Sequence, residues 1–423
     1  MTDAADVSIE QYRAAARAWV EENLERRPPG EATQLKPWDL EEQSPEELAR
    51  QRALQRRLHE AGYAGITWPV EYGGQGLTRE HEQAFLKEAA GFLLPDLGIA
   101  GGATFGVCAP TMLAHATPAF LRRVIPRVLS GDLIVSQFFS DPDAGSDLAA
   151  VRTQAVRDGD RWILTGSKIW SSGAYYADAG MCLARTNWDV PKHRGLTWFL
   201  VPTDADGLTI ERIRQINDDS EFCQEFLDGV ELTDDDLIGE VNAGWSVTQT
   251  MLLYERGAGS AGGGASKGAG VRADLLELVD SVGGLDDPEV RDLFARIHVD
   301  DLVRSSLGRR LLALMTADMD NAGNLASYGK LASGVYDPIR ANRVLRVAGR
   351  SGIAWESPDD PGAVAALGLL NSRFMAIAGG TAQMQRNTIG ERVLGLPREP
   401  SFDRSKPFRD VVRDSQSWSG SVG

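Results

Sequence analysis

Two stretches near the middle of this 423-residue chain combine small hydroxyl side chains, turn residues and one large aromatic ring. They are residues 136–147, SQFFSDPDAGSD, and residues 168–173, KIWSSG. Neither holds a charge relay or a set of metal ligands; both offer hydroxyls and backbone N–H groups, and the second adds an indole. Such groups suit a flat, electron-accepting ring that is stacked on one face and hydrogen-bonded along one edge. The two stretches therefore predict a flavin pocket.

Four motifs in order give the chain a specific family resemblance. The first stretch resembles the FSEPGAGSD signature of the acyl-CoA dehydrogenases, and the second resembles their KxWxT/S segment. Residues 68–74, WPVEYGG, resemble the N-terminal WPxEYGG turn, and residues 379–387, GGTAQMQRN, resemble the C-terminal EGTxQxQR element. One motif alone is a weak signal, whereas four in the right order, spread over nearly the whole chain, are a strong one.

The resemblance implies an α+β fold with three domains. These are an N-terminal helical domain (1–132), a central flavin-binding β domain built as a barrel or sandwich (133–241), and a C-terminal four-helix-bundle domain (242–423) that carries oligomer contacts. The chain's own patterns agree, since apolar residues recur at helical spacing first, then alternate in short runs after Asp132, and return to helical spacing from Trp245. The polar tail after Pro400 is consistent with either an ordered arm or a frayed end.

FAD is the cofactor that the resemblance implies. Ser140 and Ser172 resemble the residues that bond the polar edge of the ring, and Trp170 resembles the aromatic residue that packs against it. Each residue also has an ordinary interpretation, because a Trp in a β unit is usually core and Thr381 could simply cap a helix. The expected FAD-binding residues are Phe138, Ser140, Trp170, Ser172, Thr381 and Gln383.

Dehydrogenation beside a thioester needs a base for the α-proton. The resembling enzymes carry a glutamate in one of two places. The first is Gly379 here, which cannot act as a base; the second is Glu255, in MLLYERG (251–257). Helical spacing puts Glu255 on one face with Thr248 and Leu252, which predicts a buried carboxyl with a raised pKa. A structural ion pair with Arg256 is the alternative.

Three further residues are expected to touch the substrate. The resemblance places the Gly379 N–H against the thioester oxygen, Ser146 against the pantetheine or the flavin edge, and Arg256 at the substrate end of the pocket. A plain Gly-Gly turn, a turn or helix cap with Asp147, and a surface salt bridge are the respective alternatives.

The implied activity is FAD-dependent α,β-dehydrogenation of an acyl-CoA thioester to the 2-enoyl-CoA. Glu255 would abstract the α-proton, a β-hydride would pass to flavin N5, and an electron-transfer flavoprotein would take the electrons. Two alternatives stay open: a flavin oxidase or monooxygenase of the same fold, and a non-catalytic partner subunit of a hetero-oligomeric acyl-CoA dehydrogenase. The sequence does not reveal acyl length, branching or a steroid-like substrate.

The chain departs from the family pattern around the ADP half of FAD. No RxxFG segment follows the first C-terminal helix, the GGxG element is only hinted at by residues 348–352, and Asp143 replaces a usual Gly. Such departures resemble a divergent bacterial branch that handles bulky acyl-CoAs, so a homotetramer or dimer is expected and a hetero-oligomer is possible. A GxGxxG match at 257–262 follows a segment with helical rather than strand periodicity, which argues against a dinucleotide fold.

Composition excludes several other classes. A net charge of −16 without a basic run argues against nucleic acid as a partner. Three widely spaced cysteines and five histidines without metal-ligand spacing predict reduced thiols and no metal site. The acidic N-terminus lacks a signal-peptide pattern and no run is long enough for a membrane span, so we expect a cytoplasmic enzyme.

Overall fold

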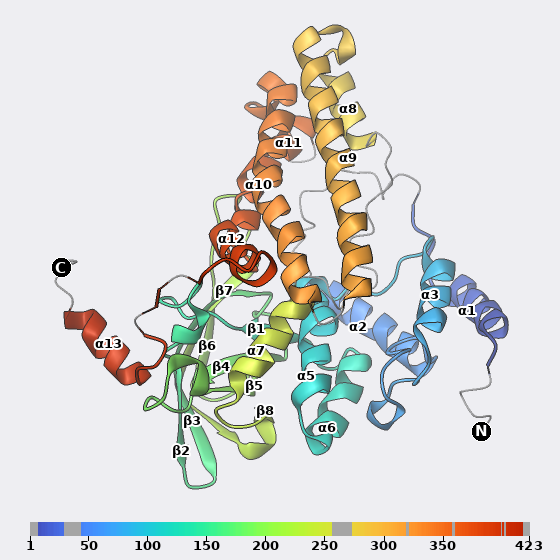
Figure 1. Ribbon diagram of the computed structural model, residues 1–423. Coiled ribbons are helices and arrows are strands. Elements are labelled where there is room, and N and C mark those ends of the chain that lie inside the picture. Colours follow the sequence, from blue (N-terminus) through green and yellow to red (C-terminus); the bar gives the residue numbers. More distant parts are fainter. Residues whose placement is uncertain are drawn as a thin grey trace.

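The computed structural model describes residues 7–28, 44–255, 273–318, 321–357, 360–398, 400–401 and 403–417. Helices come first, a sheet follows, and a second set of helices rises above it (Figure 1). Within these residues no helix is long and apolar enough to cross a membrane. The order of helices, sheet and helices confirms the α+β prediction.

The N-terminal part is helical, and α6 shows why. Thr117 caps its N-terminus by accepting the Phe120 N–H, and Pro118 occupies the first turn, where its missing donor costs nothing. One face of α6, including Leu121 and Val128, is buried in the core. The helices are α1 (Ile9–Asn23), α2 (Pro45–Glu60), α3 (Arg79–Ala89), α4 (Gly98–Ala103), α5 (Ala109–His115) and α6 (Pro118–Leu129).

The central sheet is mostly antiparallel. Its main path runs β6-β7-β3-β2-β4-β5-β8, and β1 pairs in parallel with β4. The strands are β1 (Val135–Phe138), β2 (Gln154–Asp158), β3 (Arg161–Ser172), β4 (Ala179–Arg185), β5 (Leu196–Pro202), β6 (Leu208–Arg212), β7 (Phe222–Thr233) and β8 (Leu237–Ile238).

Strands β4 and β5 are buried on both faces. On β5, Trp198 and Leu200 pack into the core shared with the N-terminal helices, whereas Phe199 and Val201 pack against β3 and β7. Because successive residues of a strand point to opposite faces, a strand between two cores is apolar throughout. This explains the continuous apolar runs of the sequence.

Helices α8 to α11 form the upper layer in Figure 1, whereas α7 lies low beside the sheet and α13 lies at the lower left. A cluster on α8, α9, α10 and α11 contains Leu278, Ile297, Val347 and Ala365. The helices are α7 (Gly244–Leu253), α8 (Ala273–Ser281), α9 (Pro288–Ala317), α10 (Ala322–Ala348), α11 (Pro361–Asn371), α12 (Ala382–Thr388) and α13 (Phe408–Ser417).

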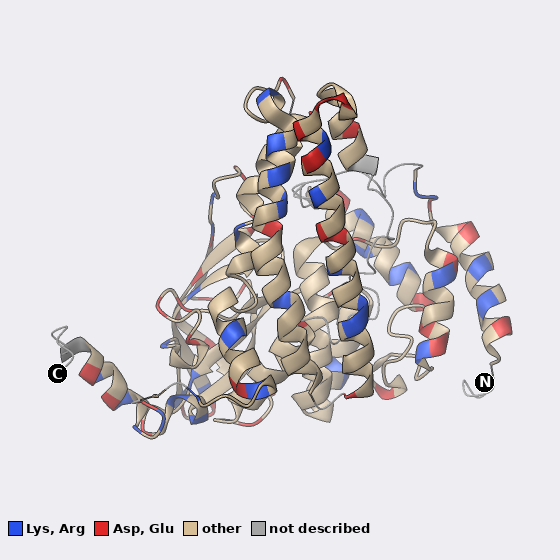
Figure 2. Ribbon diagram, turned by 45° about the horizontal axis from the view of Figure 1, so that its top comes forward, with Lys and Arg blue, Asp and Glu red and all other residues tan. Residues whose placement is uncertain are grey.

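Ion pairs tie the two longest helices together. Arg340 on α10 pairs with Asp301 on α9 at 2.8 Å, and Arg304 on α9 pairs with Asp337 on α10. Figure 2 shows both positively and negatively charged residues along the two long helices. Burial is the largest influence on Asp337 and raises the pKa of its carboxyl despite the nearby arginines.

Residues 403–417 form an arm that includes α13. Helix α13 packs on the sheet side of the molecule, where the Phe408 ring stacks on Trp188 at 5.5 Å and lies 3.9 Å from the guanidinium of buried Arg185. Lys192 donates to Asp403 of the arm and to Asp147 of the first sequence motif, both through Nζ. The arm therefore fastens onto the loop that carries the motif.

Candidate functional site

The structure brings the two central motifs together at the ends of neighbouring strands. The Ile169 N–H donates to the Ser140 carbonyl at 2.9 Å, and the Ser136 hydroxyl donates to the Ser172 carbonyl at 3.0 Å. Lys168 spans the gap by donating to the Phe139 carbonyl and to Asp141 Oδ1, at 3.0 and 2.7 Å. The second motif, expected to be a turn, is the end of β3, and it forms one surface with the turn after β1.

Lys168 and Asp141 form an ion pair that is almost fully buried, with side-chain exposures of 0% and 7%. Burial alone would raise the pKa of Asp141, but Lys168 and the backbone N–H groups of Thr153 and Arg152 together lower it. The Thr153 hydroxyl adds a further hydrogen bond at 2.8 Å. The carboxylate is thus held in one orientation, which fixes the first turn.

Trp170 is not a core residue. It lies in the left-handed region with φ of 69°, its side chain is 57% exposed, and its ring meets the edge of Phe222 at 5.9 Å. Ser140, in the turn after β1, and Ser172, the last residue of β3, are partly exposed. An open indole face beside two hydroxyls matches the needs of a flavin ring, so these residues fit the implied cofactor.

Phe138 has a different environment. Its side chain is completely buried in the core of the sheet, where a Cβ added to Gly180 would lie 2.4 Å from its ring. A cofactor contact from this residue would therefore come from its backbone.

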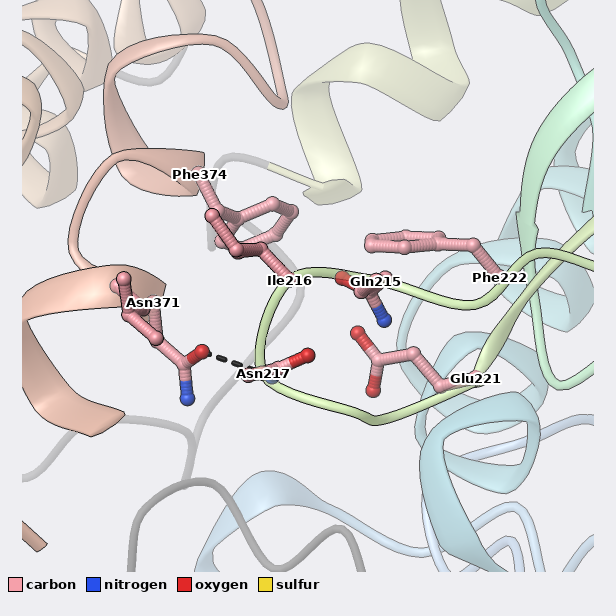
Figure 3. A pocket seen from close by; sticks show the side chains of 8 residues that line it. Gln215, Ile216, Asn217, Glu221, Phe222, Asn371 and Phe374 are labelled. Atoms are coloured by element: carbon pink, nitrogen blue, oxygen red, sulfur yellow. Dashed lines mark hydrogen bonds between the residues drawn. The ribbon is translucent and has the colours of Figure 1, made fainter. Parts of the chain in front are cut away.

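A pocket of about 180 Å³ lies beyond Trp170, between the β6–β7 connection and the end of α11 (Figure 3). Phe222 and Phe374 line it with ring centres 6.0 Å apart, and Asn217 donates to Asn371 at 2.8 Å. Burial and the neighbouring Asp219 raise the pKa of Glu221, another lining residue, to about 7. None of the four motifs contains these residues; the polar run at 217–221 predicts only a turn, so sequence reasoning missed this pocket.

Glu255 and Gly379, 124 positions apart, meet in space. A Cβ added to Gly379 would lie 3.1 Å from Glu255 Oε1 and 3.2 Å from Lys330 Cε, so the glycine keeps a gap open between the two side chains. Burial lowers the pKa of Lys330, while Glu255 opposes that shift. The Lys330 amino group donates to the Met375 carbonyl at 2.6 Å.

The predicted burial of Glu255 is wrong, because its side chain is exposed. The α-helical part of α7 ends at Leu253, and Glu255 lies past that end, where the side chain leaves the packed face that buries Thr248. Arg256, the alternative ion-pair partner, lies outside the described residues, as does the 257–262 glycine run.

The remaining predicted residues lie at the surface of this region. Thr381 caps α12 by accepting the Met384 N–H at 3.1 Å, which is its ordinary role, while Gln383 is exposed. Gln385, which the sequence did not single out, is buried and donates to the Gly379 and Gly380 carbonyls. Ser146 is exposed beside Asp147, whose carboxylate accepts from Lys192 at 2.7 Å.

Three family profiles match the chain in order. They are the acyl-CoA dehydrogenase N-terminal domain at residues 8–132, the middle domain at 136–228, and the C-terminal domain at 242–394. Together they span most of the chain and follow the layers of the fold.

Individual relatives agree. The acyl-CoA dehydrogenase IpdE1 of Mycobacterium tuberculosis is 33% identical over 392 residues, covering 92% of this chain and 98% of IpdE1. The acyl-CoA dehydrogenase FadE34 of the same organism is 36% identical over 81% of this chain, which spans about half of FadE34 (46%). The solved Tcur3481-Tcur3483 steroid ACAD superposes with a TM-score of 0.70 at 28% identity, covering 94% of this chain and 99% of that chain.

Breaking the buried ion pair tests its role in the site. Lys168→Met leaves the Asp141 carboxylate buried without its cation, so we expect the free energy of unfolding to fall by about 3–5 kcal/mol in urea denaturation. Arg161→Met, which removes an exposed pair with Glu231, is the control and should cost less than about 1 kcal/mol. Equal losses in the two variants would show that the buried pair has no special role.

Filling the gap at Gly379 tests its contact with Glu255. In Gly379→Ala the added methyl meets a strained φ of 63° and displaces Glu255 Oε1, so acyl-CoA should reduce the bound flavin at least about tenfold more slowly while FAD stays bound. Gly395→Ala is the matched control, since its φ is 69° but nothing lies within 4 Å of the added Cβ. Similar rates of flavin reduction in the two variants would contradict a role for the Gly379–Glu255 contact in the reaction.

Proposed function

We propose, on the premise that the chain belongs to the acyl-CoA dehydrogenase family, that Glu255 is the base that takes the α-proton of the thioester. As a member of that family, the chain is an FAD-dependent oxidoreductase that dehydrogenates an acyl-CoA. The observation that carries the assignment of the base is the approach of Glu255 Oε1 to Gly379 across a gap that only a glycine leaves open.

The mechanism follows from what each residue can do. Glu255 receives the α-proton on a carboxylate oxygen, and the nearby positive charge of Lys330 favours the ionised form that can accept it. The Gly379 N–H holds the thioester oxygen as negative charge develops there. When bound, FAD supplies the acceptor for the hydride that leaves the β-carbon.

The cofactor is proposed to lie on the surface made by the turn after β1 and the end of β3. Trp170 stacks on the ring, Ser140 and Ser172 bond its polar edge, and Phe138 contributes its backbone. Thr381 and Gln383 contact the diphosphate of FAD, and Ser146 and Arg256 contact the substrate. The support is the exposure of the Trp170 indole beside two partly exposed hydroxyls.

The domain boundaries near residues 133 and 242 remain part of the proposal. They are supported by the short connections between α6 and β1 and between β8 and α7. An electron-transfer flavoprotein is the proposed electron acceptor.

The proposed assembly is a homo- or hetero-oligomer. Three apolar side chains of α9, Val299, Val303 and Leu312, are 56%, 53% and 66% exposed, and exposed apolar residues on one helix favour association. The steroid ACAD that this chain resembles is named for two proteins, Tcur3481 and Tcur3483, which supports a mixed assembly as well as a symmetric one.

Replacing the carboxylate tests the base. Glu255→Gln keeps the size of the side chain but cannot accept the α-proton, so the variant should purify with FAD bound and lose bleaching of the flavin by acyl-CoA by at least about 10³-fold. Stopped-flow absorbance of the flavin under anaerobic conditions measures this. A variant that is bleached at the normal rate would reject Glu255 as the base.

The substrate class can be tested by the same absorbance change. Because the 28%-identical solved structure is a steroid ACAD, we expect a steroid acyl-CoA to bleach the flavin faster than straight-chain acyl-CoAs, by about tenfold or more in kcat/KM. Faster bleaching by a straight-chain thioester would contradict the proposed preference while leaving the assignment of the base intact.

A further inference from the structure

A change of phase in β3 puts Trp170 on the outside of the sheet. Up to residue 169 the buried side chains of β3 are Trp162, Leu164 and Lys168, so strict alternation predicts that residue 170 also points inward. Instead the pairing with β7 passes from Ile169↔Gln224 directly to Ser171↔Cys223, and Trp170 is left over as an extra residue. This is a β-bulge, and because of it residue 171 points inward and residue 170 points outward.

The bulge is not a conformation that its own residue favours. Trp170 has φ of 69°, where the Cβ of a bulky side chain is crowded by its own backbone. Residues held in such regions persist only when their surroundings fix them. Some contact next to Trp170 must therefore hold the bulge in place.

The contact lies one residue further along. The Ser171 hydroxyl, turned inward by the bulge, donates to Glu225 Oε2 at 2.8 Å, and the two residues are 1% and 0% exposed. Glu225 is directly opposite Lys168 in the β3–β7 register. Because Lys168 already donates to Asp141, Ser171 is the side chain that supplies this buried carboxyl with a hydrogen bond.

A polar pair in an apolar core favours the one register that joins its members. If β3 lost the bulge, Ser171 would point outward, and the Glu225 carboxyl would be left in the core without its hydroxyl donor. The indole of Trp170 would meanwhile enter the space that the small serine now occupies. The Ser171–Glu225 hydrogen bond therefore opposes both changes at once.

We propose that Glu225 is a positioning residue for the flavin wall, the surface formed by Ser140, Trp170 and Ser172. Through its hydrogen bond with Ser171 it stabilises the bulge that presents the Trp170 indole to the cofactor. The inference rests on the proposed role of Trp170 and is independent of the assignment of Glu255. The carboxyl itself touches neither the substrate nor the cofactor, because it is enclosed by the sheet.

The protonation of Glu225 is coupled to this arrangement. Burial raises its pKa to about 7, although the Ser171 hydroxyl and Lys168 oppose the shift. Among the described residues, the other titratable groups around the carboxyl are Asp141, which Lys168 neutralises, and the thiols of Cys182 and Cys223. Because the pKa is raised in the folded state, the stabilisation is complete below the pKa of an unfolded glutamate, near 4.3, and is lost as pH rises through about 7.

Glu225→Leu tests the lock by removing the acceptor while keeping the volume. We expect the Kd of the apoprotein for FAD to rise at least about tenfold, and the visible spectrum of bound flavin to shift, because the indole is no longer held in place. Val230→Ala is the matched control, since it trims another fully buried side chain of β7 away from the bulge. It should lower the melting temperature without changing FAD affinity or spectrum.

The outcome that overturns the proposal is a Glu225→Leu protein that binds FAD with the affinity and spectrum of Val230→Ala. If Glu225→Leu does not fold, Ser171→Ala replaces it, since this variant removes the donor with little change in volume, and a loss of FAD affinity of about threefold or more is expected. An unchanged affinity in Ser171→Ala would equally reject the lock. These readouts do not depend on turnover, so they separate this inference from the assignment of the base.

Glu225→Gln adds a test by pH. The amide accepts from Ser171 but does not titrate, so the melting temperature of this variant relative to the wild-type protein should increase from about pH 5 to about pH 8. A constant difference across that range would show that the carboxyl does not titrate in the folded protein, and would remove the pH coupling from the proposal.

Discussion

The candidate site depends on one buried ion pair. Lys168 lies in β3, Asp141 follows β1, and their contact at 2.7 Å joins the end of β3 to the turn after β1, the two segments that carry the serine and tryptophan side chains of the flavin wall. Charges this deeply buried are tolerated only when they are paired and hydrogen-bonded, so the pair specifies a single arrangement of the turns rather than adding much net stability. Thr153 and the Phe139 carbonyl complete the network.

The same constraint extends outward in two directions. Toward the sheet, Lys168 is opposite Glu225, whose hydrogen bond with Ser171 stabilises the bulge at Trp170. Toward the chain end, Asp147 of the first motif shares Lys192 with Asp403 of the C-terminal arm. The flavin wall is therefore supported on its inner side by the Ser171–Glu225 hydrogen bond. On its outer side it is connected to the arm through Lys192. The proposed base lies just past the end of α7 and faces Gly379, which precedes α12.

The sequence predicted much of the fold because local patterns are strong where elements are amphipathic or fully apolar. Helix α6 follows its cap and its apolar face, and β4 and β5 follow their apolar runs. The family resemblance also pointed to two residues that the fold brings close in space, Glu255 on the MLLYERG segment and Gly379 in the fourth motif.

What the sequence could not predict depends on tertiary context. Helical spacing suggested a buried Glu255, but α7 ends two residues earlier and the side chain is exposed. The resemblance predicted that Trp170 packs against the flavin, but only the pairing with β7 reveals the bulge that turns its indole out of the sheet. The pocket at Phe222 and Phe374 joins a turn to a helix about 150 residues away, so no local pattern could reveal it.

The exchange of the substrate α-proton with solvent tests the central claim, that Glu255 is the base, most directly. An acyl-CoA analogue with sulfur at the β-position cannot yield a hydride, so in D₂O the holoenzyme can only remove and return the α-proton, and NMR follows its replacement by deuterium. The wild-type protein should catalyse the exchange, and Glu255→Gln should slow it by at least about 10³-fold with FAD still bound. Exchange at the wild-type rate in Glu255→Gln would contradict the account.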